Sequence, residues 1–217
     1  MYKTVVFDLD GTLLNTLTDL ADAGNRLCRK YGWPTHERQA YRYFVGNGIP
    51  KLVERLAPAD QRTPAVLEAA LADFKRDYGQ HLRDTTAPYP GIPEMLAKLK
   101  ANGVQLAVFS NKADALAKEV VKDYFGTQYF TIVRGQMTGV APKPAAEGTN
   151  ALLQALHADP ASTLYVGDSN VDVETAHNAN LPCCGAVWGF RTREELNAAG
   201  AEYLAENSDE LYDVITK

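Results

Sequence analysis

Short runs of apolar residues, rich in valine and other strand-forming types, occur once at the start of the chain and several times after residue 100. A run that is apolar without alternation is typical of a strand buried on both faces, as in a parallel sheet covered by helices. The pattern predicts strands at residues 4–7, 104–109, 130–133, 163–166 and 183–188.

Apolar residues at helical spacing fill the segments between these strands. Met95, Leu96 and Leu99, for example, fall on one face of a helix over residues 93–100. Similar patterns predict helices at residues 113–124, 145–156, 171–179, 194–199 and 208–215. Strands that alternate with helices from about residue 90 onward indicate an α/β fold with a parallel sheet.

The segment after the first strand breaks this alternation. It contains no convincing strand, and glycine and proline separate four predicted helices at residues 18–30, 36–44, 49–56 and 64–82. The sequence therefore predicts a Rossmann-like three-layer core with a parallel sheet, formed by residues 1–14 and 88–217. An all-helical domain is inserted into this core at residues 15–87.

Composition narrows the range of functions. The 217 residues are 46% hydrophobic and 23% charged, which is ordinary for a soluble globular protein. The net charge is −5 and no basic stripe stands out, which argues against a nucleic-acid partner. No apolar run approaches the roughly 18 residues that a membrane span needs. The three cysteines lack the spacing of a zinc site or a disulfide framework and suit a reducing cytoplasm.

Two aspartates follow the first predicted strand. Asp8 and Asp10 stand where ligands bind in open α/β sheets, beyond the carboxyl end of a strand. Two like charges held close together are costly, and a divalent cation would compensate for them. The Asp-x-Asp pattern by itself fits an acidic turn or a helix cap equally well.

A second acidic pair follows the predicted strand at residues 163–166. Asp168 stands at the strand end, from which it can reach a metal at the same sheet edge, and Asp172 lies one helical turn further on. The alternative for this segment is an N-capped helix start, which Ser169 or Asp168 could provide.

A hydroxyl group and a lysine complete the candidate chemistry. Ser110 and Asn111 follow the strand at residues 104–109, and a hydroxyl followed by backbone amides suits phosphoryl oxygens. Lys143 stands between two prolines, which restrict its backbone. Taken singly, a helix cap and a solvated surface lysine explain these residues as well.

In their order along the chain, these groups resemble the four motifs of the haloacid dehalogenase superfamily of phosphatases, in its form with a helical cap after the first strand. The motifs are Asp8-Leu9-Asp10-Gly11-Thr12, Ser110-Asn111-Lys112, Lys143-Pro144 and Gly167-Asp168-x-x-x-Asp172. The resemblance covers essentially the whole chain. It implies that residues 1–14 and 88–217 are the catalytic core and residues 15–87 the cap domain.

The resemblance also implies roles for the aspartates. Asp8 would be the nucleophile that forms an aspartyl phosphate. Asp10 would protonate the leaving oxygen and then activate water. The implied cofactor is Mg²⁺, held by Asp8, the backbone carbonyl of Asp10 and Asp168.

The other motif residues would act on the phosphoryl group. By resemblance, Ser110, the amide of Asn111 and Lys143 bind the transferring oxygens, and Lys143 counts with the catalytic residues. The resemblance further implies that Thr12 would support the phosphoryl pocket and that Asp172 would orient Lys143 or a metal-bound water.

Within the superfamily, residues 44–56, 188–191 and 194–201 resemble segments of phosphoglycolate phosphatases. One departure is the Ala145-Ala146 pair after Lys143-Pro144, where the family more often has a proline and an acid. The implied function is Mg²⁺-dependent hydrolysis of a small phosphate monoester, with 2-phosphoglycolate as the first candidate.

The carboxylate of phosphoglycolate needs a second anion site. The sequence offers the turn Gly46, Asn47 and Gly48, with Lys51 in the helix that follows and Arg55 one turn further on. A plain turn between helices, followed by a solvated lysine, explains the same residues equally well.

Other functions stay open at this stage. A phosphomutase of the β-phosphoglucomutase type would keep both aspartates, and pyrophosphate or a sugar phosphate could be the substrate. Outside enzymes, a phospho-accepting receiver would place its acid pair next to each other and lack the helical insert, and an inactive binding module would have lost an acid or the lysine. The chain could be a monomer or a homodimer.

Overall fold

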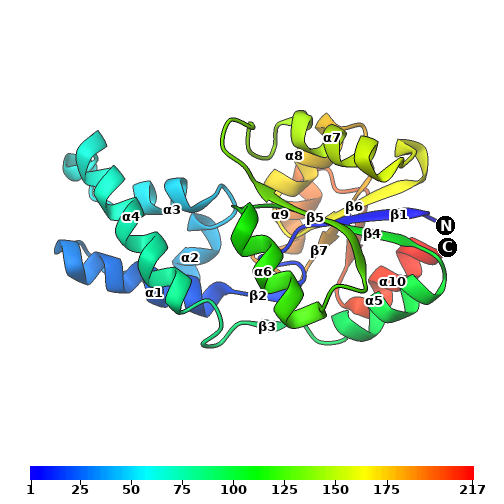
Figure 1. The fold of residues 1–217 in the computed structure, drawn as a ribbon, viewed down its shortest axis with the longest axis horizontal. Helices are drawn as coiled ribbons and strands as arrows, with labels where there is room; N and C mark the ends of the chain where they lie inside the picture. The colour runs from blue at the N-terminus through cyan, green and yellow to red at the C-terminus, as the bar shows by residue number, and fades with distance from the viewer. The chain divides into compact units, whose positions relative to one another are not determined.

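The computed structural model describes residues 1–217, and they form two compact units. The core unit consists of Met1–Asn15 and Pro88–Lys217, and the helical unit consists of Thr16–Ala87. Figure 1 shows the sheet of the core unit and the helices of the helical unit. None of the helices is both long and apolar enough to cross a membrane.

The core unit is built on a six-stranded sheet in the order β5-β4-β1-β6-β7-β8, and every neighbouring pair is parallel. The strands are β1 (Thr4–Phe7), β4 (Gln105–Ala113), β5 (Phe130–Gln136), β6 (Thr163–Gly167), β7 (Cys183–Ala186) and β8 (Tyr203–Ala205). A separate two-stranded sheet pairs β2 (Leu14–Asn15) with β3 (Ala87–Pro88). The predicted α/β fold with a parallel sheet is confirmed.

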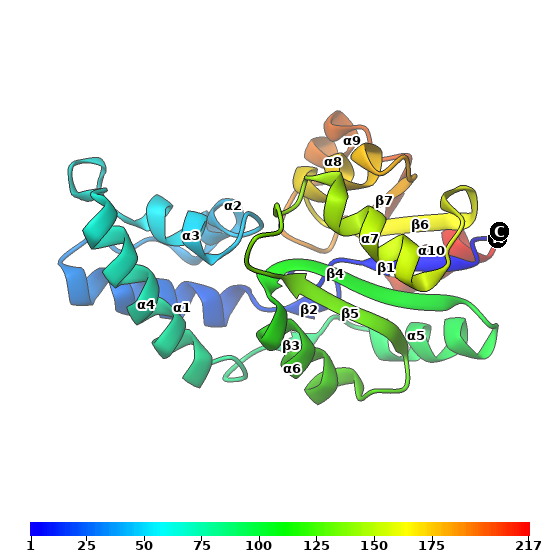
Figure 2. The ribbon, with the colours of Figure 1, turned by 45° about the horizontal axis from the view of Figure 1, so that its top comes forward.

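Helices cover both faces of the large sheet. They are α5 (Ile92–Ala101), α6 (Asp114–Phe125), α7 (Ala146–Leu156), α8 (Asn170–Asn178), α9 (Arg193–Ala199) and α10 (Ser208–Thr216), with a short 3-10 helix at Pro160–Ser162. Figure 2 shows α7, α8 and α9 on one side of the sheet. Their apolar side chains share one core cluster with the row Val6, Ala107 and Tyr165 from three adjacent strands.

The first strand lies between β4 and β6 inside the sheet, and all four of its residues are buried. Its register aligns Phe7 with Val108 of β4 and with Val166 of β6. The residues that follow these three positions therefore meet at one carboxyl edge of the sheet. That edge is where ligands bind in folds of this kind.

Three short or extended strands depart from the sequence expectations. β4 runs on to Ala113, beyond the predicted end at residue 109, so the motif residues that follow lie in a strand and not at a helix cap. The last predicted strand ends at Ala186, and β8 was not predicted. β8 has three residues, of which Tyr203 is exposed, too few to show a strand pattern.

The helical unit contains α1 (Leu17–Tyr31), α2 (Arg38–Phe44), α3 (Ile49–Leu56) and α4 (Pro64–Gln80), with a 3-10 helix at Ala59–Gln61. Its buried side chains include Leu20, Leu27, Tyr41, Leu52, Leu56, Phe74 and Tyr78. Asp19 is buried among them and accepts hydrogen bonds from the backbone and hydroxyl groups of Thr85 and Thr86, at 2.5–3.2 Å. This carboxylate ties the start of α1 to the end of the unit.

Replacing Asp19 by alanine should destabilise the protein because the backbone N–H groups of Thr85 and Thr86 lose their acceptor. We expect a loss of about 1–3 kcal/mol in the free energy of unfolding, measured by urea denaturation. Asp22→Ala is the matched control, since Asp22 is an exposed aspartate of the same helix. Equal losses in the two variants would contradict this anchoring role.

Candidate active site

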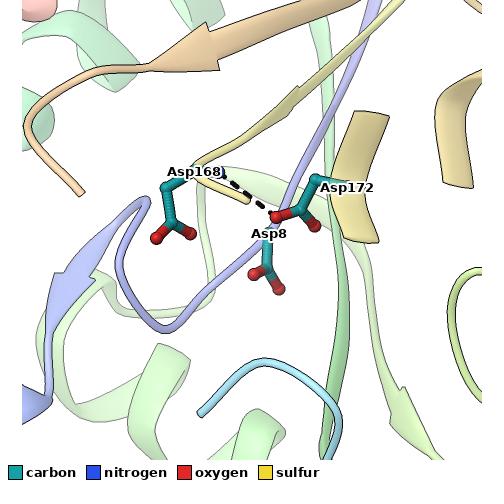
Figure 3. Close-up of side chains that lie close together, drawn as sticks. All are labelled: Asp8, Asp168 and Asp172. Carbon is teal, nitrogen blue, oxygen red and sulfur yellow. Dashed lines mark hydrogen bonds between the residues drawn. The ribbon is translucent and has the colours of Figure 1, made fainter. Parts of the chain in front are cut away.

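Three aspartates gather at the carboxyl edge of the sheet. Asp8 follows β1, Asp168 follows β6, and Asp172 lies in the first turn of α8. One carboxylate oxygen from each lies within 4.8 Å of the others, and all three residues are buried. Figure 3 shows the three side chains together, with the backbone N–H of Asp168 donating to Asp172.

Asp172 has both carboxylate oxygens engaged by protein donors. Its Oδ1 lies 2.7 Å from the Nζ of Lys143. Its Oδ2 accepts from the backbone N–H groups of Asp168 and Ser169, at 3.2 and 3.1 Å, and from the Ser169 hydroxyl at 2.7 Å. Asp172 therefore anchors the loop and Lys143, and it has little left to offer an ion.

Lys143 is buried between two of the acids. Its Nζ lies 2.9 Å from Oδ1 of Asp8 and 2.7 Å from Oδ1 of Asp172, and it donates to the Tyr165 hydroxyl at 3.2 Å. Burial disfavours the charged ammonium, but the two carboxylates outweigh burial and raise the pKa of Lys143 well above its usual value. The ammonium is therefore a fixed positive charge beside Asp8.

The side chain of Asn111 holds the backbone of Lys143 in place. The N–H of Lys143 donates to Oδ1 of Asn111 at 2.8 Å, and Nδ2 of Asn111 donates to the carbonyl of Lys143 at 3.2 Å. Ser110, the preceding residue, is also buried and accepts the backbone N–H of Lys112 at 3.3 Å. The second motif thus fixes the lysine of the third.

Asp168 is held by donors from two other loops. The Thr12 hydroxyl donates to its Oδ1 at 3.1 Å, and the backbone N–H of Phe190 donates to its Oδ2 at 2.7 Å. Gly11 and Gly189 leave room for this carboxylate, because a methyl group on either would collide with Asp168. The structure therefore places Thr12, expected to support the phosphoryl pocket, directly on Asp168.

The three buried acids repel one another. Burial is the main cause that raises the pKa of Asp8 to about 7, with Lys143 opposing and Asp172 adding to the rise. Burial, Asp172 and Asp8 also raise the pKa of Asp168 well above its usual value. A cation bound between these carboxylates would favour their ionised forms and so oppose both shifts.

The donor set fits a hard divalent cation. Asp8 Oδ1 is buried and makes no hydrogen bond, although the Lys143 ammonium lies close to it. Asp8 and Asp168 offer carboxylate oxygens, and no thiol or imidazole joins the cluster. Oxygen ligands of this kind suit Mg²⁺ rather than zinc or copper.

The carboxylate of Asp10 lies outside this cluster. Lys112 faces it, with Nζ 3.1 Å from Oδ1 and 3.3 Å from Oδ2. The Lys112 side chain is 2% exposed and that of Asp10 is 14% exposed. From the sequence alone, Lys112 has no predicted role beyond membership of its motif.

The turn of the helical unit that was expected to help bind the substrate contains Gly46, Asn47 and Gly48. Gly46 and Gly48 have positive φ, as a tight turn requires. Lys51 is 46% exposed and pairs with Glu54 at 2.8 Å. The cation on the turn is Arg55, which donates to the carbonyls of Tyr43 and Phe44 and to Oδ1 of Asn47 at 2.8–3.1 Å.

Sequence reasoning missed several residues that complete the core site. Besides Lys112, they are Tyr165, Gly189, Phe190 and Trp188, whose indole N–H donates to the carbonyl of Thr12 at 3.0 Å. Three of these five residues follow β7. The rule that ligand sites lie beyond the carboxyl ends of strands could have found them.

Comparison with known proteins agrees with the geometry. Residues 5–186 match the family model described as haloacid dehalogenase-like hydrolase. A phosphoglycolate phosphatase of Chromobacterium violaceum is 31% identical, over 98% of this chain and 96% of its own. A plasmid-encoded one of Cupriavidus necator is 32% identical, over 98% and 92%.

Solved structures extend the similarity to the fold. The crystal structure of a predicted phosphoglycolate phosphatase from Haemophilus somnus 129PT superposes with a TM-score of 0.89 at 25% identity. The match covers 98% of this chain and 97% of the other. The chain therefore belongs to the haloacid dehalogenase-like hydrolase family and is an enzyme of its phosphatase class.

Proposed function

We propose that this phosphatase is Mg²⁺-dependent and hydrolyses a small phosphate monoester, 2-phosphoglycolate foremost, through an aspartyl phosphate on Asp8. The observation that carries the proposal is the buried Asp8 carboxylate, flanked by the Lys143 ammonium and by Asp168. The names of relatives at about 30% identity support the substrate. A direct test is the release of inorganic phosphate from phosphoglycolate, with and without EDTA.

In the first step, an oxygen of Asp8 attacks phosphorus while the bond to the leaving oxygen breaks. Asp10 gives its proton to that oxygen. Asp8, the backbone carbonyl of Asp10 and Asp168 would hold Mg²⁺. When bound, the ion would keep Asp8 ionised and offset charge on the phosphoryl oxygens.

In the second step, Asp10 takes a proton from a water molecule, whose oxygen attacks the phosphorus of the aspartyl phosphate. The bond between phosphorus and Asp8 breaks, and inorganic phosphate and a free carboxylate result. Ser110, the amide of Asn111 and Lys143 bind the phosphoryl oxygens in both steps. Thr12 contributes through Asp168, and Asp172 orients Lys143.

For the substrate carboxylate we keep the turn of Gly46, Asn47 and Gly48, together with Lys51, as the proposed site. Both glycines have positive φ, which lets the backbone of the turn come close to a ligand. Arg55 stabilises its shape by bonds to carbonyl groups, and the exposed Lys51 can exchange Glu54 for an incoming carboxylate.

A phosphomutase is the second candidate, because it would use the same two aspartates. It differs in product, since it returns an isomerised sugar phosphate instead of inorganic phosphate. Pyrophosphate and sugar phosphates belong in the same substrate panel. Release of phosphate without an isomer favours the hydrolase.

We further propose that the enzyme works in the reducing cytoplasm, as a monomer or a homodimer. All three cysteines are free and buried. Burial raises the pKa of Cys28 to about 11 and that of Cys184 to about 12, so these thiols stay protonated and unreactive. Their role in this proposal is to fill apolar space.

Asp8→Asn should abolish turnover, because it removes the anionic nucleophile. We expect a fall in kcat of at least about 10³-fold, measured as phosphate release. Acid quenching should trap phosphoprotein in the wild type and none in the variant. Asp213→Asn, a change in an exposed ion pair, serves as the control. Substantial activity in Asp8→Asn would overturn the proposed mechanism.

Mg²⁺ should raise the melting temperature more at pH 8 than at pH 5.5. Without the ion, the pKa of Asp8 is raised to about 7, so the folded protein binds the Asp8 proton more tightly than the unfolded chain does. The stability that this proton adds is present at low pH and is lost as the pH rises through about 7. Mg²⁺ binds the ionised form, so protons compete with it at the lower pH. Melting curves in EDTA and in excess MgCl₂ measure both effects.

Asp168→Ala is the variant to compare with the wild type, because it removes a proposed Mg²⁺ ligand. It should reduce the rise in melting temperature that Mg²⁺ causes. It should also raise the Mg²⁺ concentration needed for half-maximal activity. Replacing all three cysteines should leave both quantities unchanged. Equal shifts at the two pH values in the wild type would count against carboxylate binding of the ion.

Lys51→Ala should weaken catalysis on phosphoglycolate more than on p-nitrophenyl phosphate, which has no carboxylate. We expect kcat/KM for phosphoglycolate to fall about tenfold, the size of one hydrogen bond to a charged group. Gly48→Ala tests the turn itself, and Lys75→Ala is the control at an exposed lysine of the same unit. Parallel losses on both substrates would leave the turn without a role in specificity.

A further inference from the structure

A second buried lysine faces the second aspartate of the first motif. Lys112 lies with its Nζ 3.1 and 3.3 Å from the two carboxylate oxygens of Asp10. We infer that Lys112 is a positioning residue that fixes the orientation of the Asp10 carboxylate for proton transfer. The inference rests on the proposed function, in which Asp10 serves as acid and base.

Burial makes this ion pair different from those on the surface. The Lys112 side chain is 2% exposed, whereas Lys51, which pairs with Glu54, is 46% exposed. An exposed pair contributes little and does not hold its partner still. A buried ammonium needs its partner, so Lys112 and Asp10 constrain each other.

The near-equal distances to both oxygens matter for geometry. An ammonium that sits astride a carboxylate restrains the rotation of the carboxylate plane. A carboxylate has about four lone-pair positions, so this contact leaves others free for a proton. Lys112 can therefore restrain Asp10 without taking its place in proton transfer.

The backbone of Lys112 is itself anchored. It lies in β4, next to the central strand, and its N–H donates to the hydroxyl of Ser110 at 3.3 Å. Asn111 between them holds the backbone of Lys143. Three consecutive residues thus fix the phosphoryl-binding hydroxyl, the lysine beside Asp8 and the orientation of Asp10.

The two buried lysines serve different acids. Lys143 lies between Asp8 and Asp172, and Lys112 faces Asp10. Proton transfer requires heavy atoms about 2.6–3.2 Å apart. A misplacement of 1 Å can lower the rate about 10²-fold. Loss of the restraint on Asp10 should therefore be measurable as a fall in kcat.

The test combines Lys112→Met with Asp10→Asn in a double-mutant cycle on two substrates. Lys112→Met should lower kcat on phosphoglycolate by about 10- to 100-fold, with KM changed far less. The loss on p-nitrophenyl phosphate should be smaller, because its leaving group needs less protonation. In the Asp10→Asn background, Lys112→Met should cost little more, since the group that it positions is gone.

Lys112→Arg tests the charge directly and should retain more of kcat on phosphoglycolate than Lys112→Met. Lys118→Met, which breaks the exposed pair with Asp114, controls for loss of a lysine near the same strand. Melting curves separate stability from positioning. If Lys112→Met does not fold, the test uses Lys112→Arg and Asp10→Asn instead. The quantity compared is then the ratio of kcat on phosphoglycolate to kcat on p-nitrophenyl phosphate.

Several outcomes would overturn the inference. Additive losses in the double variant, equal losses on both substrates, or a rise in KM for phosphoglycolate with kcat intact would each assign Lys112 another role. A change in melting temperature without a change in kcat would make the pair structural. Failure of the wild type to release phosphate from either substrate would instead refute the proposed function, and this inference with it.

Discussion

The site depends on the cost of placing several carboxylates together in a buried position. Asp8, Asp168 and Asp172 converge because β1, at the centre of the parallel sheet, ends level with its neighbours β4 and β6. Their mutual repulsion and burial raise the pKa of Asp8 and of Asp168. The positive charge of Lys143 offsets part of this repulsion. The negative charge that remains favours the binding of a cation.

Hydrogen bonding distinguishes three chemically identical side chains. Asp172 accepts from four protein donors, including Lys143, and Asp168 accepts from Thr12 and Phe190. Oδ1 of Asp8 instead lies 2.9 Å from the Lys143 ammonium. The three carboxylates therefore differ in the donors that the surrounding loops supply to them.

Much of this arrangement could be predicted from the sequence, because apolar strands and the residues that end them are local features. The sheet, the helices and the family were predicted from such patterns and are confirmed. Other partnerships between distant parts of the chain could not be predicted. Lys112 and Asp10 are 102 positions apart, and Phe190 meets Asp168 from a different loop, so only the folded sheet edge brings them together. The same applies to Arg55, since periodicity does not show that its side chain turns back to the carbonyls of Tyr43 and Phe44.

Charge balance explains why the core alone cannot choose the substrate. Counted as ionised, the four aspartates of the motifs and the two buried lysines leave two negative charges, which one divalent cation would neutralise. Every phosphate monoester presents much the same dianion to such a site. The groups at the sheet edge act on the phosphoryl group and on the proton of the leaving oxygen, which all these substrates share. Discrimination must therefore come from contacts to the rest of the substrate. For phosphoglycolate that remainder is a small anion, so a cation or a group of backbone amides would be needed to recognise it.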